Sequence, residues 1–522
     1  MLPALAALVV YVPALSGGFL SDDYSQLEMF HGASAGEVAA RAGRTFVSGI
    51  GPPSNQYRPL TMASFAANTL ASGADPVPWR LTNVLLHAAN ASLVAFLSWQ
   101  LAASAARGVR TAAVAAGVAF AWFAPSAEAV AWISARFDGM ALFWMLVAAC
   151  AYMASREWRD RYGILSLAAT VLAFLSKESA AIGPALIVAL GWVKRPERER
   201  LARGIAATLA ASLPWLLIGA AYFAYRMWLF GDPFRFYPGT SPGAALLSGQ
   251  WLAALSATID WWPRALPEDG ARHVFTLAGV LICVAAVSAG LANRHEGRVL
   301  VALAAALVVT VALLFSHWTW SITGEGGRVL YAPAAIAALI VALPLRASLR
   351  RLRAASWLVF IALVGSSLVL ARGAVDRRVA AGAEMLALVS ALAKVADATP
   401  AGSYAFVIVP DRIGSIPFAR NAQGGLISPP VQPRPLSGRL MVQLEDALPR
   451  WQEVFEQNAL GAPRAAPGAD AGALSLPAVP DRFYCWSTRR HELVALPLVF
   501  APRLRDWNEV WAKGIDAAGC RP

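Results

Sequence analysis

The chain opens with MLPALAALVVYVPALSGGFLSDDYSQ (residues 1–26), where an apolar run meets two adjacent carboxylates, Asp22 and Asp23. The run is long enough to cross a membrane, since a span needs about 20 mainly apolar residues. It has no basic residues at its start and is followed by many further apolar runs, so we interpret it as an uncleaved first span and not as a signal peptide. The two like charges therefore stand where a membrane-spanning helix is expected to end.

The composition also indicates a membrane protein. Of the 522 residues, 57% are hydrophobic and 15% are charged, whereas about a quarter of the residues of an ordinary soluble chain are charged. These values predict a polytopic α-helical membrane protein. The net charge of +12 does not indicate nucleic-acid binding, because most Lys and Arg residues lie in short loops between apolar runs.

Apolar runs recur along the first two thirds of the chain, and we predict about 11 spans, at residues 1–20, 81–105, 111–127, 139–155, 162–176, 179–193, 204–229, 273–292, 298–316, 329–346 and 354–371. With a cytoplasmic N-terminus, every loop on the cytoplasmic side is rich in Arg or Lys, as the positive-inside rule requires. These loops are 106–110, 155–163, 194–203, 293–298 and 346–353. An odd number of spans then places the C-terminal region outside the cytoplasm.

The predicted domains are a transmembrane domain of residues 1–371 and a small α/β domain of residues 372–522 outside the cytoplasm. The outer loop 21–80 of the first domain carries the acidic motif. In the second domain, SYAFVIVP (403–410) is predicted to be a buried strand and residues 439–459 a helix. Cys485 and Cys520 lie in this domain and are expected to pair if the compartment is oxidising.

Polar residues gather on the predicted outer side, where spans begin or end. Charges at membrane depth are costly, so they are usually paired or functional. Structural interpretations stay open for all of them: an ion pair between Glu128 and Arg136, interhelical hydrogen bonds from Asn83 and His87, a simple loop at Lys177-Glu178, and a helix N-cap at Asp22-Asp23. The stretches concerned are YRPL (57–60), NVLLHAANA (83–91), AVAWISARFD (129–138), LSKESA (175–180) and GRVLYAP (327–333).

Together with FLSDDYSQ (19–26), and in this order, these stretches resemble the GT-C membrane glycosyltransferases, which use polyprenyl-phosphate-linked sugars. The similarity covers roughly residues 15–335. It is greatest to the branch of the protein O-mannosyltransferases and the transmembrane-and-TPR O-mannosyltransferases. The tail lacks TPR repeats, so a protein acceptor is not carried over. The resemblance implies a transferase that moves a hexosyl or pentosyl group, with inversion, from a polyprenyl phosphate to an acceptor hydroxyl outside the cytoplasm.

The resemblance also implies roles for individual residues. The acidic motif of the family falls on Asp22 and Asp23, of which Asp22 is expected to be the base and Asp23 to orient the acceptor or to bind a divalent metal; the opposite assignment stays open. A second carboxylate raises the proton affinity of the pair. The departing phosphate needs cations, and a guanidinium can hold two of its oxygens. The residues expected to bind the donor phosphate or sugar are Tyr57, Arg58, His87, Glu128, Arg136, Asp138, Lys177, Glu178, Arg328 and Tyr331.

Neither a convincing metal-ligand spacing nor a Gly-rich phosphate loop occurs in the sequence. The family that the chain resembles includes metal-independent members, which implies that no metal or cofactor is obligatory, although a divalent metal stays possible. The expected partners are membrane lipid, the polyprenyl-phosphate sugar and an acceptor glycan, lipid or protein, and no nucleic acid. The high Ala and Arg content is typical of a GC-rich bacterial genome, so the expected location is a bacterial inner membrane, with the active site and the C-terminal domain facing the periplasm.

Two other function classes stay open. A flippase or transporter for a lipid-linked sugar would also carry charges at membrane depth, although the sequence shows no paired halves. A polysaccharide polymerase or ligase would use a large outer loop rich in Arg and His, for which residues 230–272 are the candidate.

Overall fold

The structure is a computed structural model that describes residues 1–50, 55–102, 108–196, 201–232, 250–260, 271–315, 326–445, 480, 482–496 and 513–520. Most of the loop 230–272, on which the polymerase interpretation depends, lies outside the described residues. The chain divides into two compact units. Unit 1 comprises Met1–Leu15, Ser34–Ala71 and Val77–Asp376, and unit 2 comprises Ser16–Ala33, Ser72–Pro76 and Arg377–Pro522. This division groups the acidic motif with the C-terminal region of the chain.

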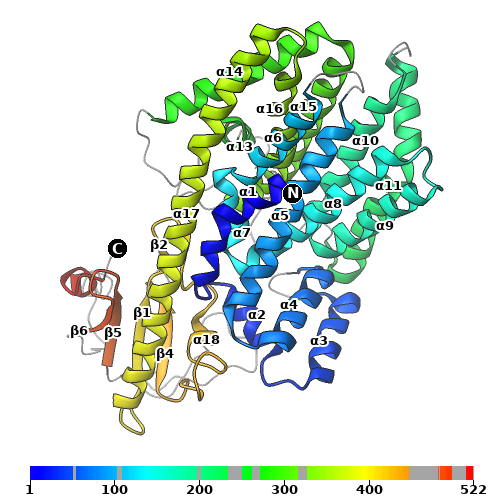
Figure 1. Ribbon diagram of the computed structural model, residues 1–522. Coiled ribbons are helices and arrows are strands. Elements are labelled where there is room, and N and C mark those ends of the chain that lie inside the picture. Colours follow the sequence, from blue (N-terminus) through cyan, green and yellow to red (C-terminus); the bar gives the residue numbers. More distant parts are fainter. Residues whose placement is uncertain are drawn as a thin grey trace. The chain divides into compact units, whose positions relative to one another are not determined.

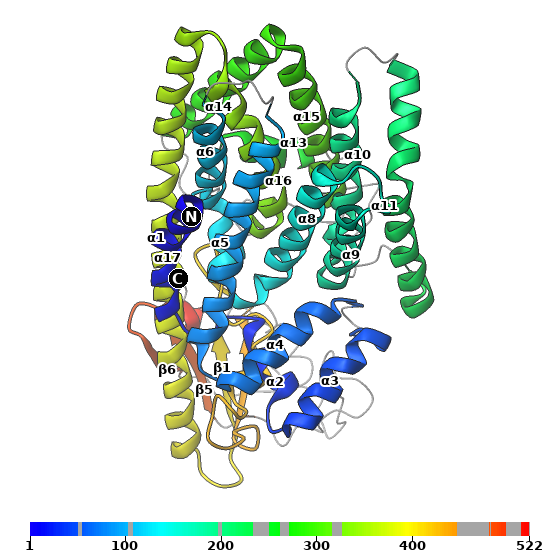
Figure 2. The same cartoon turned by 45° about the vertical axis from the view of Figure 1, so that its right-hand side comes forward.

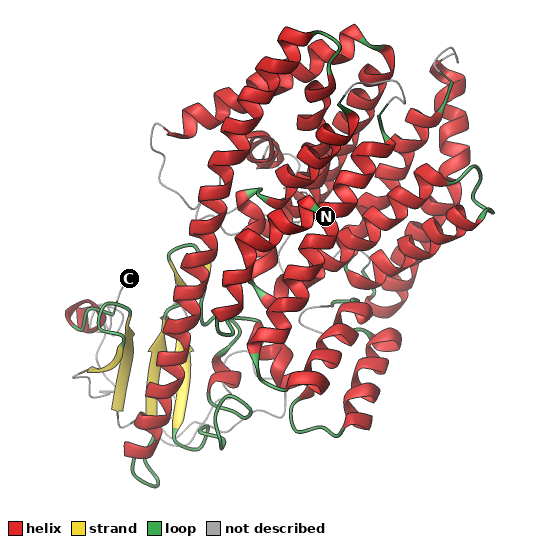
Figure 3. Cartoon of the chain, in the orientation of Figure 1, coloured by secondary structure: helices red, strands yellow, loops and turns green. Residues whose placement is uncertain are grey.

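The described residues of unit 1 form helices joined by loops, with one isolated β-bridge between Ile50 and Gln56. The helices are labelled in Figure 1 and coloured red in Figure 3. Its α-helices are α1 (Leu2–Tyr11), α3 (Ala35–Ser48), α4 (Pro59–Ser72), α5 (Pro76–Gln100), α6 (Val109–Ala121), α7 (Ala127–Ala131), α8 (Arg136–Ala154), α9 (Arg161–Ser176), α10 (Ile182–Lys194), α11 (Leu201–Phe230), α13 (Gln250–Asp260), α14 (Ala271–Ala292), α15 (Arg294–Phe315), α16 (Tyr331–Ala342) and the first part of α17 (Arg350–Ala398). Short 3-10 turns extend or join them: η1 (Val12–Ser16), η2 (Ala124–Ser126), η3 (Ile133–Ala135), η4 (Glu178–Ala181), η5 (Gly327–Leu330) and η6 (Leu343–Arg346).

Six of the described helical segments are long and apolar enough to cross a membrane, and a seventh is obtained if the bent pair Val109–Ala121 and Ala124–Ala131 forms one span. Shorter apolar helices occupy three further predicted runs, at Leu2–Ser16, Arg161–Ser176 and Thr276–Ala292. The predicted polytopic helical membrane protein is therefore confirmed, whereas the count of 11 spans stays a prediction.

Small residues allow the helices of unit 1 to pack closely. A Cβ atom added to Gly117 on α6 would lie 2.6 Å from the carbonyl oxygen of Ala91 on α5 and 2.8 Å from the ring of Pro3 on α1. Such close backbone approach is what small residues provide between membrane helices. Helices α8, α9, α10 and α11 also pack side by side, as Figure 2 shows.

At one end of unit 1, basic side chains bind the carbonyl groups that terminate helices. Lys194 Nζ donates to the carbonyl oxygens of Tyr152 and Ser155 at 2.9 and 2.6 Å, at the end of α8. Arg298 donates to Trp192 and Arg195 at the end of α10. A cation near the C-terminus of a helix is favourable, because the free carbonyl groups carry partial negative charge. These cations come from the loops predicted to be cytoplasmic.

Unit 2 contains a four-stranded sheet with the order β4-β1-β5-β6, formed by β1 (Ala405–Val409), β4 (Leu440–Leu444), β5 (Arg482–Ser487) and β6 (Glu492–Leu496). Strand β1 is parallel to both neighbours, and β6 is antiparallel to β5. All five residues of β1 are buried, as expected for a central parallel strand. The unit also holds α2 (Asp23–Phe30), α18 (Gln423–Leu426) and the short strands β2 (Arg412–Ile413) and β3 (Ile416–Pro417).

Strand β1 confirms the strand predicted within 403–410. The helix predicted over 439–459 is wrong at its start, because Leu440–Leu444 forms β4 and pairs with β1. Alternate residues of β4, Leu440 and Val442, are buried, so the pairing with β1 outweighs the local helical pattern. Residues 446–459 of that prediction lie outside the described part of the chain.

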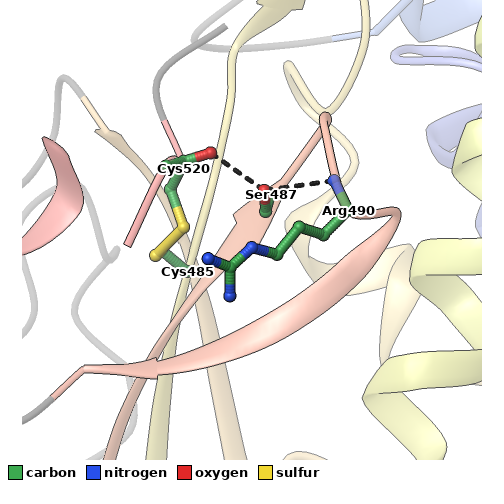
Figure 4. The surroundings of a disulfide bond; sticks show 5 residues. Cys485, Ser487, Arg490 and Cys520 are labelled. Atoms are coloured by element: carbon green, nitrogen blue, oxygen red, sulfur yellow. Dashed lines mark hydrogen bonds between the residues drawn. A yellow bond between two sulfur atoms is a disulfide. The ribbon is translucent and has the colours of Figure 1, made fainter. Parts of the chain in front are cut away.

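A disulfide joins β5 to the last described segment of the chain. Cys485 and Cys520 are bonded, with their Cα atoms 6.0 Å apart, which confirms the expected pairing. Figure 4 shows the bond with Ser487 and Arg490 beside it. Ser487 Oγ donates to the carbonyl oxygen of Gly519 at 2.8 Å, so a hydrogen bond holds the same two segments together.

Candidate active site

The acidic motif begins with a sharp turn in the backbone. Ser21 adopts a left-handed conformation with φ 51°, which is uncommon for a residue other than Gly. Helix α2 starts two residues later, at Asp23. Asp23 is fully buried, and its Oδ2 atom accepts a hydrogen bond from the backbone N–H of Leu20 at 3.0 Å. Asp23 therefore stabilises the turn that leads into the helix.

Asp22 differs from its neighbour in exposure and in partner. It is the residue before α2 and is partly exposed. Its Oδ1 atom accepts a hydrogen bond from the side-chain amide of Asn421 at 2.7 Å. Among the described residues, this amide is the hydrogen-bond donor that contacts the Asp22 carboxylate.

Residues 418–425 of the C-terminal region support the acidic motif within unit 2. The backbone N–H of Ser21 donates to Phe418 at 2.8 Å, and its hydroxyl donates to the carbonyl oxygen of Arg420 at 2.9 Å. Helix α2 packs on α18, where a Cβ atom added to Gly425 would lie 2.8 Å from the Cβ atom of Tyr24. We call residues 418–425 the support loop.

The sequence did not lead us to expect the support loop or Glu28 beside the acidic motif. Glu28 lies on α2 against Gly424, and burial raises the pKa of its carboxyl. The available signal was weak: a third acidic residue follows the motif, and the stretch FARNAQGG (418–425) has the polar and glycine residues of a turn.

In unit 1, the predicted cations mostly lie against predicted carboxylates. Arg58 Nε and Nη2 donate to the two carboxylate oxygens of Glu178 at 2.8 and 2.5 Å, a bidentate pair. Lys177 Nζ donates to Asp138 Oδ1 at 2.6 Å. Lys177 follows α9 in an extended conformation, and Glu178 begins η4. The break between α9 and α10 therefore supplies one member of each ion pair.

A third ion pair joins Glu128 on α7 to Arg328 on η5. The other oxygen of Glu128 accepts hydrogen bonds from the backbone N–H groups of Gly326 and Gly327, at 3.0 and 2.8 Å. The guanidinium of Arg328 lies 4.8 Å from the ring centre of Trp132, a cation–π contact. Glu128 therefore fixes the start of the span that contains α16.

Polar residues on one face of α5 bind the carbonyl groups that the breaks in the neighbouring helices leave free. Arg80 donates to Ala131 at the end of α7. Asn83 donates to Trp132 at 2.9 Å, where the chain is extended between α7 and η3. His87 binds Ala121 at the end of α6, 3.1 Å away. Irregular backbone at membrane depth needs such partners. Asn83 and His87 thus match their structural interpretation, and Arg80 was missed although it lies three residues before Asn83.

His87 and Tyr331 form a hydrogen-bonded pair. Nε2 of His87 faces a carbonyl oxygen, which can only accept, so that nitrogen carries the proton. Nδ1 then accepts from the Tyr331 hydroxyl at 2.7 Å. The Asn90 amide donates to the same hydroxyl at 3.2 Å and to Gly139 at 3.1 Å. This network ties α5 to α8 and α16.

Arg136 and Tyr57 complete the set of predicted donor residues. Arg136 is fully buried and donates to the Asn83 side chain at 2.9 Å and to the carbonyl oxygen of Trp79 at 2.7 Å. The hydroxyl of Tyr57 donates to the carbonyl oxygen of Phe46 at 2.9 Å. Burial raises the pKa of Tyr57 to about 12, so this phenol stays protonated at neutral pH. Among the described residues, no group of three or more His, Cys, Asp or Glu side chains could hold a metal ion.

Comparisons with known proteins give a relative by sequence and two similar solved structures. No family model matches the chain. Protein O-mannosyl-transferase Tmtc1 of Drosophila melanogaster is 31% identical over 181 residues, which cover 33% of this chain. The match covers 20% of that relative, so this chain accounts for about a fifth of its length.

Two solved structures are also similar. The crystal structure of ArnT from Cupriavidus metallidurans bound to undecaprenyl phosphate has 12% identity and a TM-score of 0.41, and the match covers 92% of this chain and 98% of that one. The structure of the same protein in the apo state has 12% identity and a TM-score of 0.43, with 94% and 93% covered. At these TM-scores the two structures do not establish a shared fold. The match to the O-mannosyl-transferase confirms, over a third of the chain, the resemblance to the O-mannosyltransferases that the ordered motifs indicate.

Proposed function

We propose that this protein is a membrane glycosyltransferase that moves a sugar from a polyprenyl phosphate to an acceptor hydroxyl on the extracytoplasmic side, with Asp22 as general base. The observation that carries the proposal is the environment of Asp22: a partly exposed carboxylate at the start of a helix, whose described hydrogen-bond partner is a neutral amide. The similarity to an O-mannosyl-transferase supports the reaction class.

In the proposed reaction, the acceptor oxygen attacks C1 of the sugar as its proton passes to Asp22. The bond from C1 to the phosphate oxygen breaks, and the polyprenyl phosphate leaves with the electron pair. Because the phosphate is already a good leaving group, the reaction needs a base and cations but no strong general acid. Attack opposite the leaving group gives inversion at C1.

The four predicted phosphate-binding cations, two more exposed and two more buried, fall into two groups. The side chains of Arg328 and Lys177 are 12% and 13% exposed, whereas Arg58 and Arg136 are 5% and 0% exposed. We assign the donor phosphate to Arg328 and Lys177, and the positioning of helices to Arg58 and Arg136. Of the remaining predicted donor residues, Glu128, Asp138 and Glu178 hold the cations Arg328, Lys177 and Arg58 in place. His87, with Tyr331 bound to it, holds the end of α6, and Tyr57 contacts α3.

The disulfide supports the predicted sidedness. Disulfides persist in oxidising compartments and are rare in the cytosol. Cys485 and Cys520 belong to the unit that contains Asp22, so we assign unit 2 to the extracytoplasmic side, a periplasm if the source is bacterial. Maleimide labelling of spheroplasts should modify both thiols only after treatment with a reductant that does not cross the membrane. Labelling of both thiols without reductant would contradict the assignment.

The test of the function is sugar transfer in proteoliposomes. The donors are radiolabelled undecaprenyl phosphates of mannose, glucose and galactose, and the acceptor is a membrane and periplasm extract. We expect the wild-type protein to form labelled product from one of these donors. Movement of the donor across the bilayer without product would favour a flippase, and elongation of a lipid-linked glycan would favour a polymerase.

A further inference from the structure

We propose that Asn421 is a positioning residue for the base, in which the side-chain amide holds the Asp22 carboxylate in one orientation. This inference rests on the proposed function. Asn421 Nδ2 donates to Asp22 Oδ1 at 2.7 Å, across a sequence separation of 399 residues. The contact therefore exists only when the two ends of unit 2 have folded together.

The backbone of the support loop fixes the position of this amide. Asn421 adopts a left-handed conformation with φ 56°, which Asn tolerates better than most residues other than Gly. Its carbonyl oxygen accepts a hydrogen bond from the hydroxyl of Ser25 at 3.1 Å. Ala419 and Ala422, on either side, are fully buried. The amide is thus presented to Asp22 by a loop that is anchored both to α2 and to the interior of unit 2.

A neutral donor suits a base better than a cation would. A cation beside a carboxylate favours its charged form strongly and so weakens it as a proton acceptor. An amide hydrogen bond orients the carboxylate at a smaller cost in basicity. Because the amide occupies Oδ1, Oδ2 is the oxygen directed to the acceptor hydroxyl. A small error in such an orientation can lower the catalytic rate strongly.

Charged groups of unit 2 near the motif have partners of their own. Asp23 binds the backbone N–H of Leu20, and Arg420 binds Asp411 at 2.9 Å through Nε. Glu28 lies further along α2, against Gly424. Replacement of Asn421 by Asp would therefore add one new carboxylate directly against Asp22, and its effect on Asp22 can be measured.

Two variants distinguish the effect of the Asn421 amide from the effect of its backbone conformation. Asn421→Gly keeps the left-handed conformation and removes the amide, and Asn421→Asp keeps the size and replaces the donor by a like charge. The matched control is His491→Gly, since His491 is an exposed residue of unit 2 with φ 55° that binds the carboxylate of Glu384. One readout is transfer of the labelled undecaprenyl-phosphate hexoses. The other is the pH of half-maximal modification of Asp22 by a water-soluble carbodiimide, read by mass spectrometry.

In Asn421→Gly we expect kcat to fall about tenfold or more with KM for the donor nearly unchanged. In Asn421→Asp we expect the half-modification pH of Asp22, and the acidic limb of the transfer profile, to rise by about one unit. His491→Gly should match the wild type in both readouts. An unchanged half-modification pH in Asn421→Asp overturns the inference even without a transfer assay. Wild-type kcat in both variants, with Asp22→Asn inactive, overturns it while the base assignment stands. Full activity of Asp22→Asn would overturn both the role of Asn421 and the assignment of Asp22 as base.

Discussion

The carboxylates of the predicted site differ between the two units in what they bind. In unit 1, Glu178, Asp138 and Glu128 each bind a cation: Arg58, Lys177 and Arg328. In unit 2, Asp23 binds a backbone N–H group and Asp22 binds the amide of Asn421. A carboxylate held by a cation is a poor proton acceptor, whereas one held by a neutral donor keeps more of its basicity. This difference is consistent with the proposed function, in which the unit 1 pairs position helices and donor and Asp22 accepts the proton.

Breaking an ion pair in unit 1 should have the largest effect on stability. Arg58→Met leaves the buried carboxylate of Glu178 without its bidentate partner, and the loss of one member of a buried pair costs about 3–5 kcal/mol. The midpoint of thermal unfolding in detergent should fall accordingly. The double variant Arg58→Met/Glu178→Leu should recover most of this loss, because an apolar pair of similar volume can replace a buried ion pair.

The same double variant sharpens the comparison between positioning and catalysis. If Arg58 only positions helices, transfer should return together with stability. If stability returns and transfer does not, Arg58 or Glu178 acts on the donor, and their assignment to the positioning of helices is wrong.

A smaller effect is expected where α2 packs on the support loop. In Gly425→Ala the new methyl group would meet the Cβ atom of Tyr24 at 2.8 Å. Both groups are attached directly to backbone, so relief requires a shift of α2 or α18, at a cost of about 1–3 kcal/mol. Gly438→Ala is the matched control, since nothing lies within 4 Å of its added Cβ atom. Equal unfolding midpoints for the two variants would contradict the described packing of the acidic motif.

The smallest effect concerns a carboxylate of unit 1 that binds only backbone groups among its described contacts. Asp160, before α9, accepts hydrogen bonds from the N–H groups of residues 156, 157, 162 and 163. Those from Arg156 and Gly163 contribute most to lowering its pKa to about 2. An ordinary Asp has a pKa of about 4. Its contribution to stability should therefore be complete above about pH 4 and be lost as the pH falls through about 2.

Thermal unfolding between these pH values tests this contribution in wild type and Asp160→Asn. The difference between the two proteins should shrink as the pH falls. A difference that is independent of pH would show that the charge of Asp160 contributes nothing.

Much of the fold of unit 1 could be predicted from the sequence, because apolar runs and the distribution of Arg and Lys are local signals. The breaks at Trp132 and Lys177 also fall in gaps that the sequence leaves between predicted spans, at 128–138 and 177–178. The partners that bind the free carbonyl groups there could not be predicted. Asn83, for example, donates to the carbonyl oxygen of Trp132 from another helix, and no local pattern specifies that contact.

The residue types of the candidate site could be predicted from the sequence, but their contacts could not. The acidic pair and the cations were recognised as residue types in an ordered set of motifs, but their pairing depends on tertiary contacts. A pair between Glu128 and Arg136 was one open interpretation, but Glu128 binds Arg328, 200 residues along the chain. Asn421 was not recognised, because its relation to Asp22 spans 399 residues and rests on a turn that resembles any polar loop.

The most direct test of the central claim compares Asp22→Asn with Asp23→Asn and Glu178→Gln in the transfer assay, with the unfolding midpoint of each variant measured alongside. The account predicts that Asp22→Asn lowers kcat by about 100- to 10,000-fold at an unchanged midpoint, as loss of a general base does. Asp23→Asn and Glu178→Gln should lower the midpoint, with transfer reduced only as far as folded protein is lost. Transfer by Asp22→Asn at the wild-type rate would contradict the claim that Asp22 is the base.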